Sequence, residues 1–317
     1  MLQLPLGMTG LKVSAIVLGC LNFESRTDKS TSYRLLDQYQ DAGGTSLDTS
    51  NNYAFWNEGC QGGESEKLLG QWMKERGNRD RMFVATKVGA KPSFPGGGFE
   101  NMEGLGHKTI EKAIDESLLR LGTDYIDLYY SHIDDGETPL EETLEVMNRL
   151  VRAGKVRALG CSNHRLSRLQ EARRISQAHN WAAYSCIQQR YTYIRPNSAA
   201  DFGVQVSVDE ELLSYCQSTQ DVSLLAYSPL LNGAYTRSEA LLPAQYQGPQ
   251  TISKLKVLKE VASETEGTVN QIVLAWMLQG APTAIPLIAA SNPGQLQENL
   301  GSLNIRLTQD QLERLNA

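Results

Sequence analysis

Short apolar runs alternate along the whole chain with longer stretches in which apolar residues recur every three or four positions. One such stretch has Ile110, Ile114 and Leu121 on a single helical face, and Gly122 directly after it is a typical helix stop. An apolar run at 125–131 follows and has the length of a buried strand. The pattern therefore predicts helices and strands in regular alternation.

Eight apolar runs qualify as strands by their length and by the turn residues that flank them. They cover residues 15–19, 45–49, 81–87, 125–131, 156–161, 185–189, 222–228 and 283–288. Capping patterns predict helix starts at Thr138 with Glu141 (Pro139 taking the first helical position), Ser207 with Glu210, Thr268 with Gln271 and Thr308 with Gln311. Continuous alternation of this kind requires a parallel sheet.

About eight strand–helix units in 317 residues, with no linker between them, favour a single domain over 1–317 that closes into a (β/α)8 TIM barrel. Residues 2–14 carry turn signals and predict an N-terminal β-hairpin that caps the bottom of the barrel. The rival is an open, doubly wound sheet, which normally carries GxGxxG after its first strand. No such string occurs; the nearest glycine-rich piece, at 95–99, lies in a loop after Lys87.

Composition and charge narrow the function classes. Hydrophobic residues make up 41% and charged residues 21%, as in ordinary globular proteins. The net charge is -6 with no basic cluster, which argues against a nucleic-acid partner. No run approaches the roughly 18 apolar residues of a membrane span, and the N-terminus lacks a signal-peptide pattern. Five widely spaced cysteines without CxxC are typical of reduced thiols, so we expect a cytoplasmic protein.

Polar residues stand at the ends of the predicted strands, where the active sites of barrels are built. They are Asp48, Lys87, His132, Ser162, Asn163, Gln188, Tyr227 and Ser228, with Tyr53 on the loop just after Asp48. Each has an ordinary structural reading when taken alone: a helix cap, a solvated lysine, a packed tyrosine or a hydrogen-bonded core histidine. Their convergence on one mouth of the barrel is what indicates a functional site.

The chemistry of this group points to proton transfer. A tyrosine hydroxyl has an ordinary pKa of about 10, which a neighbouring ammonium lowers. We therefore expect Lys87 to activate Tyr53 as the general acid/base, with Asp48 orienting Lys87 and a ring N–H of His132 orienting a carbonyl oxygen. No side chain donates hydride, so a cofactor must supply it. The scattered histidines and carboxylates predict no metal site.

The segments SLDTSNNY, FVATKVG and DLYYSHID resemble the catalytic segments of the aldo-keto reductase superfamily. The resemblance spans nearly the whole chain and implies a catalytic tetrad of Asp48, Tyr53, Lys87 and His132. It also implies that the protein is an NAD(P)H-dependent oxidoreductase acting on an aldehyde or ketone.

The same resemblance implies a nicotinamide cofactor site. GCSNH and CIQQR place Ser162, Asn163 and Gln188 on the carboxamide of the nicotinamide. LLAYSPLLNG implies that Tyr227 stacks on the nicotinamide ring and that the pyrophosphate is lined by Ser228, Pro229, Leu230, Asn232 and Gly233. LIAASNPGQLQENLGSL resembles the adenosine-end loop, with contacts at Ser291, Gln295, Glu298 and Asn299.

The chain departs from the family pattern in two places, and the first bears on the choice of cofactor. Many family members carry an Arg near the position of Ser291 that grips the 2′-phosphate of NADP, and this chain has none there. The adenosine-end loop resembles that of potassium-channel beta subunits, which bind NADP without that Arg, and Arg237 lies near where a basic residue of that subgroup reaches the phosphate. We expect NADP(H), with NAD(H) as the alternative. The second departure is Ala289, which replaces a loop glycine.

Loops over the mouth supply the candidate substrate pocket, formed by Asn22, Phe23, Phe55, Trp56 and Ile133. An aromatic wall suits a moderately apolar or ring-shaped carbonyl compound, although Trp56 equally well pins its own loop. Sugars, aldehydes, ketones and quinones all stay open as substrates. Two other functions stay open as well: an NAD-linked sugar or alcohol dehydrogenase, and an NADP-binding redox sensor, against which the intact tetrad argues.

Overall fold

Ten strands form a small N-terminal sheet and one closed barrel in a computed structural model that describes residues 1–236 and 242–317. The eight barrel strands are β3 (Val17–Gly19), β4 (Ser46–Asp48), β5 (Phe83–Val88), β6 (Ile126–Ser131), β7 (Val156–Ser162), β8 (Tyr184–Arg190), β9 (Ser223–Tyr227) and β10 (Ala284–Ile288). All pairings within the barrel are parallel, and β10 closes the ring by pairing with both β9 and β3. The predicted (β/α)8 barrel is confirmed, and every predicted strand run overlaps one of these strands.

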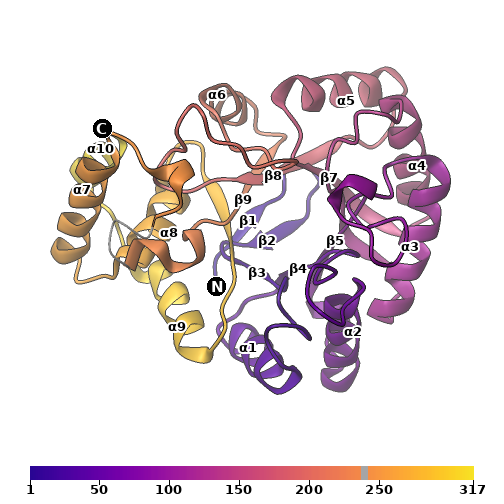
Figure 1. The fold of residues 1–317 in the computed structure, drawn as a ribbon, viewed down its shortest axis with the longest axis horizontal. Coiled ribbons are helices and arrows are strands. Elements are labelled where there is room, and N and C mark those ends of the chain that lie inside the picture. Colours follow the sequence, from indigo (N-terminus) through magenta and orange to yellow (C-terminus); the bar gives the residue numbers. More distant parts are fainter. Residues whose placement is uncertain (237–241) are drawn as a thin grey trace.

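Helices surround the barrel as an outer layer (Figure 1). The described helices are α1 (Lys29–Asp41), α2 (Glu64–Arg76), α3 (His107–Leu121), α4 (Leu140–Arg152), α5 (Leu166–Ala178), α6 (Glu210–Ser218), α7 (Thr251–Glu264), α8 (Val269–Gln279), α9 (Pro293–Gly301) and α10 (Gln309–Asn316). Helices α1 and α9 contact each other, so the two ends of the chain meet at the closure of the ring. Within the described residues, none of these helices has the length and hydropathy required to cross a membrane.

The helix starts test the capping predictions. Capping boxes at Thr268 with Gln271 and at Thr308 with Gln311 are confirmed at the starts of α8 and α10. The Ser207 prediction is wrong, because the carboxylate of Asp209 accepts from the backbone of Leu212 at 2.8 Å and takes the cap position.

The start predicted at Thr138 is also wrong. Helix α4 begins at Leu140 with Pro139 in the cap position. The backbone N–H and the hydroxyl of Thr138 both donate to the carboxylate of Asp135, at 3.1 and 2.6 Å, so its side chain is not available to the helix. A carboxylate acceptor competes well for these donors because the hydrogen bonds are charge-assisted.

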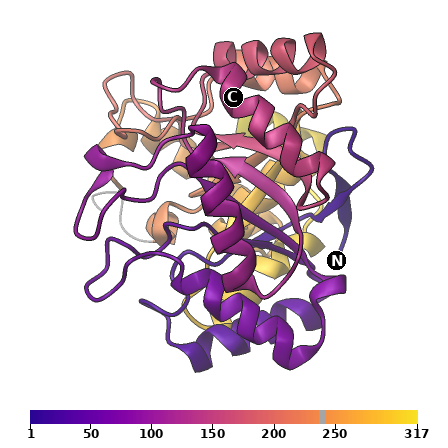
Figure 2. The ribbon, with the colours of Figure 1, turned by 90° about the vertical axis from the view of Figure 1, so that its right-hand side faces the viewer.

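The predicted N-terminal hairpin is present as β1 (Gln3–Pro5) paired antiparallel with β2 (Lys12–Ser14). Its side chains Leu6 and Val13 are buried in the same cluster as the barrel-interior residues Val17 and Phe83. Figure 2 shows the hairpin and the N-terminus at one end of the barrel and long loops at the opposite end. The hairpin therefore seals one end and leaves the other to the loops.

The alternation of side chains along β5 brings a lysine into the barrel. Phe83 and Ala85 belong to the interior cluster, and a strand period of two puts Lys87 on the same face, one layer nearer the loops. Lys87 lies opposite Tyr130 of β6, and its ammonium is 5.6 Å from the centre of the Tyr130 ring. Gly160 of β7 makes room for that ring, since a Cβ there would lie 2.6 Å from it.

Candidate active site

The four residues of the predicted tetrad meet at the loop end of the barrel. Asp48 is the last residue of β4, Lys87 stands near the end of β5, and His132 directly follows β6. Tyr53 comes from the loop after β4, whose turns are held by backbone bonds such as Tyr53 N–H to the carbonyl of Ser50 at 3.3 Å. Asp48, Tyr53 and Lys87 are buried, and His132 is half-buried.

The Lys87 ammonium uses its three donors inside this group. It donates to Tyr53 Oη at 2.7 Å, to the carbonyl of Thr49 at 2.8 Å, and to Asp48 Oδ1. The Tyr53 hydroxyl in turn donates to Asp48 Oδ1 at 3.2 Å. Lys87 and Asp48 form an ion pair with side chains 0% and 1% exposed. Removing one partner of such a buried pair typically costs about 3–5 kcal/mol, so the pair holds its geometry firmly.

The electrostatics of Tyr53 differ from the expectation drawn from the sequence. Burial, followed by the negative charge of Asp48, raises the pKa of Tyr53 well above its ordinary value. The expected lowering by Lys87 is therefore wrong for the protein as it stands, because removing the phenol from water outweighs the ammonium. Burial also lowers the pKa of Lys87, against the opposing pull of Asp48. Tyr53 accordingly holds its proton.

His132 is fixed through both its backbone and its ring. Its N–H donates to the carbonyl of Val88 at 2.8 Å, and its carbonyl accepts from Asn163 Nδ2 at 3.0 Å. Its ring nitrogen Nδ1 lies 3.1 Å from Ser50 Oγ. Burial, together with the charge of Lys87, holds the pKa of His132 well below its ordinary value. The imidazole is thus neutral, with its ring centre 6.0 Å from that of Tyr53.

The residues predicted to hold a nicotinamide carboxamide join this network. Ser162 Oγ donates to the carbonyl of Gln188 at 2.7 Å, and Gln188 Nε2 donates to Asp48 Oδ2 at 2.8 Å. The amide of Asn163 is engaged at both ends, since Nδ2 donates to His132 and Oδ1 accepts from Tyr227 Oη at 2.7 Å. Gln188 therefore satisfies the second oxygen of Asp48, a contact that the sequence did not suggest.

The segment after β9 has an unusual backbone. Ser228, Leu231 and Asn232 have φ angles of 56°, 47° and 55°, and Gly233 has 80°. Left-handed conformations of non-glycine residues carry strain and cluster at ligand sites. Pro229 is buried and its carbonyl accepts from Thr192 Oγ1 at 2.5 Å, while Leu230 is half-buried and Asn232 exposed.

The predicted adenosine-end residues lie around the start of α9. Ser291 donates from its N–H and its hydroxyl to Gln295 Oε1, at 2.9 and 2.8 Å, and both residues are exposed, as is Ala289. Glu298 Oε1 instead accepts from Thr268 Oγ1 at 2.7 Å, and Asn299 is buried. Arg237 lies outside the described residues.

Aromatic side chains from two loops gather above Tyr53. The Trp56 ring is 6.4 Å from that of Tyr53 and stacks on Phe99 at 6.2 Å, and Phe55 lies 5.0 Å from Phe99. Trp56 and Phe99 are 39% and 47% exposed. Of the other residues predicted for the pocket, Phe23 and Ile133 are buried and Asn22 is half-buried.

Sequence reasoning missed four residues that contact or frame this group: Ser50, Asn52, Glu103 and Phe99. Ser50 and Asn52 stand inside SLDTSNNY, the motif that carries Asp48 and Tyr53. Glu103 and Phe99 fall in the loop at 90–106, whose length alone was a signal. The motif and the length of the loop indicate the two segments that carry these residues. They do not indicate which side chains within the segments contact the site.

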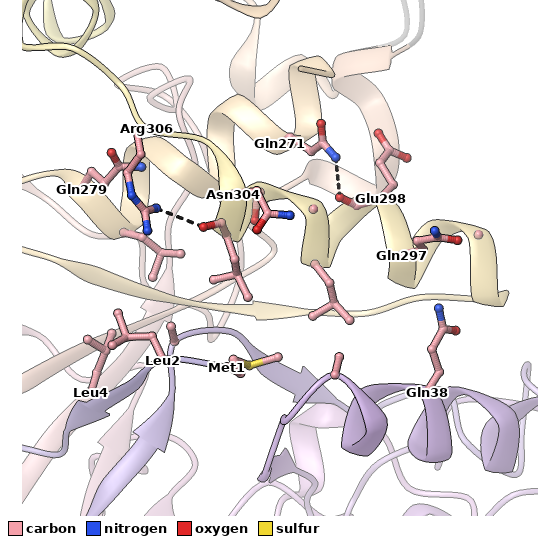
Figure 3. A pocket seen from close by; sticks show the side chains of 18 residues that line it. Met1, Leu2, Leu4, Gln38, Gln271, Gln279, Gln297, Glu298, Asn304 and Arg306 are labelled. Atoms are coloured by element: carbon pink, nitrogen blue, oxygen red, sulfur yellow. Dashed lines mark hydrogen bonds between the residues drawn. The ribbon is translucent and has the colours of Figure 1, made fainter. Parts of the chain in front are cut away.

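A separate hollow of about 1250 Å³ lies on the flank of the barrel between the N-terminus, α1, α8 and α9 (Figure 3). Its lining includes Met1, Leu2 and Leu4 of the N-terminal segment, together with Gln38 and Glu298. Residues of the hairpin end line this hollow, and none of the tetrad does. It is therefore distinct from the site around Tyr53.

Known proteins are similar to this chain over nearly its whole length. The model of the Aldo/keto reductase family matches residues 15–317. Norsolorinic acid reductase stcV of Emericella nidulans is 30% identical, with 96% of this chain and 78% of that protein covered. The aldo-keto reductase yakc of Schizosaccharomyces pombe, whose name carries the cofactor NADP(+), is 28% identical over 93% of this chain and 85% of its own length.

A solved structure is similar over the full length. The thermostable aldo-keto reductase Tm1743, crystallised with the inhibitor epalrestat, superposes with a TM-score of 0.77 at 29% identity. The match covers 100% of this chain and 99% of that chain. Sequence and structure thus agree on one family over the whole barrel.

Proposed function

The chain belongs to the aldo/keto reductase family of NAD(P)H-dependent oxidoreductases, and we propose that it reduces an aldehyde or ketone with NADPH, using Tyr53 as the proton donor. The observation that carries the proposal is the buried contact of 2.7 Å between Lys87 Nζ and Tyr53 Oη beside Asp48. A phenol in contact with an ammonium is a poised proton donor.

Each residue of the site has a separate role in the proposed reduction. A bound nicotinamide supplies the hydride. Tyr53 keeps its proton until negative charge develops on the substrate oxygen, and then donates it. Lys87 stabilises the resulting phenolate because its ammonium already contacts Tyr53 Oη, and Asp48 keeps that ammonium charged and in place. Burial of the three side chains excludes water from the transfer.

The residues present fit a nicotinamide dinucleotide. The left-handed backbone at Leu231, Asn232 and Gly233 suits a cradle of N–H groups for the pyrophosphate. Tyr227 is half-exposed beside Asn163, which suits stacking on a nicotinamide. Ser162, Asn163 and Gln188 would hold the carboxamide of such a cofactor, and their polar groups are paired here with one another or with Asp48 and His132. Ser228, Pro229 and Leu230 complete the segment, and Ser291, Gln295, Glu298 and Asn299 belong to the adenosine end.

The preference for NADPH depends on a cation for the 2′-phosphate. The cofactor in the name of yakc supports NADP, and Arg237 is our candidate for the phosphate contact. We expect Arg237→Ala to raise the dissociation constant of NADPH roughly tenfold to a hundredfold, the usual worth of a charged hydrogen bond, and to leave that of NADH unchanged. Fluorescence titration measures both constants, with the exposed Arg152→Ala as the matched control. Unchanged affinity for both cofactors would remove Arg237 from this role.

The aromatic cluster supports a ring-containing carbonyl substrate. Phe55, Trp56 and Phe99 present partly exposed rings above Tyr53, and flat apolar molecules stack well on such surfaces. The printed name of the relative stcV, a reductase of norsolorinic acid, agrees with this class. A panel of aromatic and aliphatic aldehydes and ketones, followed by NADPH absorbance, tests the choice.

The proton-donor role is tested by Tyr53→Phe. The variant keeps the ring and its packing but loses the hydroxyl, so we expect kcat to fall by about 100-fold to 10,000-fold while NADPH affinity is unchanged. Tyr33→Phe removes a phenol hydroxyl from α1, where it contacts Glu75 and not the site, and serves as the control. Near wild-type turnover of Tyr53→Phe would refute the mechanism.

A further inference from the structure

Arg190 places a cation on the inner face of the barrel wall, at the end nearest the loops. It is the last residue of β8, where Cys186 belongs to the interior cluster, and the strand period of two puts Gln188 and Arg190 on the same face. The register pairs Arg190 with Tyr227, the last residue of β9, whose ring packs against that cluster. The two side chains therefore stand next to each other at the loop end of the barrel.

The guanidinium of Arg190 is held between two aromatic rings. Its carbon Cζ lies 4.6 Å from the centre of the Phe202 ring and 5.6 Å from the centre of the Tyr227 ring. Nε and Nη2 donate to Gln205 Oε1 at 3.1 and 2.5 Å, and Nη1 donates to Tyr246 Oη at 3.4 Å. Because the planar fork is held by all these contacts, its charge keeps a fixed place beside Tyr227.

No carboxylate of the described residues forms an ion pair with Arg190. Arg195, five positions further along the chain (195 minus 190), pairs with Glu210, whereas the hydrogen bonds of Arg190 go to a neutral amide and a neutral phenol. Burial raises the pKa of Tyr227, and the nearby charge of Arg190 opposes that rise. Arg190 is half-buried, so water screens its charge only in part.

A fixed charge beside Tyr227 bears on the redox state of a nicotinamide that stacks there. The oxidised nicotinamide ring of NADP+ carries a positive charge, and the dihydronicotinamide ring of NADPH is neutral. A cation next to the aromatic ring repels the charged form and does not repel the neutral one. It also competes with the charged form for the electron-rich face of the tyrosine ring.

We propose that Arg190 makes the site discriminate between the two redox states of its cofactor, weakening the binding of NADP+ relative to that of NADPH. The inference rests on the proposed function, in which Tyr227 stacks on the nicotinamide. Weaker binding of NADP+ assists its exchange for NADPH after each reduction, and release of the product cofactor limits turnover in many enzymes.

Two other roles for Arg190 predict different results. As an anchor of the loop at 197–208, it would act through Gln205. As a partner of the pyrophosphate, it would strengthen the binding of both redox states equally. The main chain holds the same loop, because Arg190 N–H donates to the carbonyl of Val206 at 3.1 Å and Val208 N–H donates to the carbonyl of Arg190 at 2.9 Å. We therefore expect the loop to stay folded when the side chain is changed.

Isothermal titration calorimetry with NADP+ and with NADPH tests the proposal without turnover. We expect the ratio of the two dissociation constants, NADP+ over NADPH, to fall roughly twofold to fivefold in Arg190→Met, the range for a charge interaction at a partly exposed site. Arg190→Gln, a second neutral variant that still has a donor, gives the same fall. Arg190→Lys keeps the charge and the wild-type ratio. Gln205→Ala removes the acceptor of the guanidinium but leaves the charge, and it is the matched control with an unchanged ratio.

Three results overturn the proposal while leaving the cofactor site in place. The first is an unchanged ratio in both neutral variants. The second is an equal rise of both constants, which would assign Arg190 to the phosphates. The third is a fall in Gln205→Ala as large as in Arg190→Met, which would assign it to the loop. A wild type that binds neither form refutes the proposed cofactor site and this inference with it, so the same titrations distinguish the two failures.

Discussion

Tyr53 owes its protonation state to its surroundings more than to the lysine that touches it. Burial and Asp48 raise the pKa of the phenol well above 10, whereas the contact with Lys87 acts in the opposite direction. A phenol with a high pKa is a poor acid in the ground state, yet it gives up its proton readily once an alkoxide develops within reach. In the proposed mechanism Lys87 then stabilises the phenolate as it forms. In the proposed mechanism a protonated Tyr53 is the form that carbonyl reduction requires.

The pH dependence of the two directions follows from that pKa. The raised pKa keeps Tyr53 protonated everywhere below it, so we expect kcat for carbonyl reduction to stay flat from about pH 6 to about pH 9. Oxidation of the alcohol needs the phenolate, so its kcat rises about tenfold per pH unit over the same range. Absorbance of NADPH at saturating cofactor measures both. A reduction rate that falls above about pH 7 would contradict the raised pKa.

The sequence could predict that Asp48, Tyr53, Lys87 and His132 lie close together, but not how they are charged. Asp48, Lys87 and His132 stand at strand ends, and the barrel geometry brings strand ends together. The pKa of Tyr53 depends on burial, which no local pattern reveals, and its predicted direction was wrong. The contacts of Gln188 with Asp48 and of Ser50 with His132 are also set by side-chain packing between strands.

The loop that carries Tyr53 is held by the loop after β5. Asn51 Nδ2 and the N–H of Gly89 both donate to Glu103 Oε1, at 2.7 and 2.9 Å. Asn51 N–H also donates to the carbonyl of Lys87 at 3.3 Å. Glu103 thus bridges the loop that supplies the phenol and the loop that directly follows the strand of Lys87.

Removing that bridge tests its importance. In Glu103→Ala two largely buried donors lose their acceptor, so we expect the free energy of unfolding to fall by about 2–4 kcal/mol, as measured by urea denaturation. A loosened Tyr53 loop also lowers kcat severalfold more than it weakens cofactor binding. Glu103→Gln keeps the Oε1 acceptor and is the matched control. Equal behaviour of the two variants would show that the bridge has no positioning role.

Strands and most helices were predictable because buried strands and amphipathic helices leave periodic patterns. Their ends were less so. Thr268 and Thr308 cap their helices as predicted, whereas Asp209 and Asp135 displaced the caps expected at Ser207 and Thr138. A capping pattern predicts a side chain that could accept a hydrogen bond at the helix start. A neighbouring carboxylate can take the cap position or bind that side chain instead.

The hairpin and the tetrad lie at opposite ends of the barrel. The hairpin seals one end with Leu6 and Val13, and the reacting groups lie at the other end, beyond the layer that contains Ala85. The closed topology and the hairpin were both predictable, because eight strand–helix units without a linker allow few other arrangements. The placement of the aromatic cluster was not, since it requires Phe99 and Trp56 to meet from loops 43 positions apart in the chain (99 minus 56).

A substitution in the hairpin shows whether the two ends are independent. Leu6 is 0% exposed in the interior cluster, so Leu6→Ala leaves a cavity at the sealed end, and we expect the free energy of unfolding to fall by about 2–5 kcal/mol. Because the tetrad is held by its own contacts at the opposite end, kcat and KM below the unfolding transition stay at wild-type values. Urea denaturation and NADPH consumption measure the two properties, with the 66% exposed Leu2→Ala as a control expected to change neither. A loss of kcat in Leu6→Ala while the protein is fully folded would mean that packing at the hairpin is transmitted along the barrel to Lys87 and Tyr53.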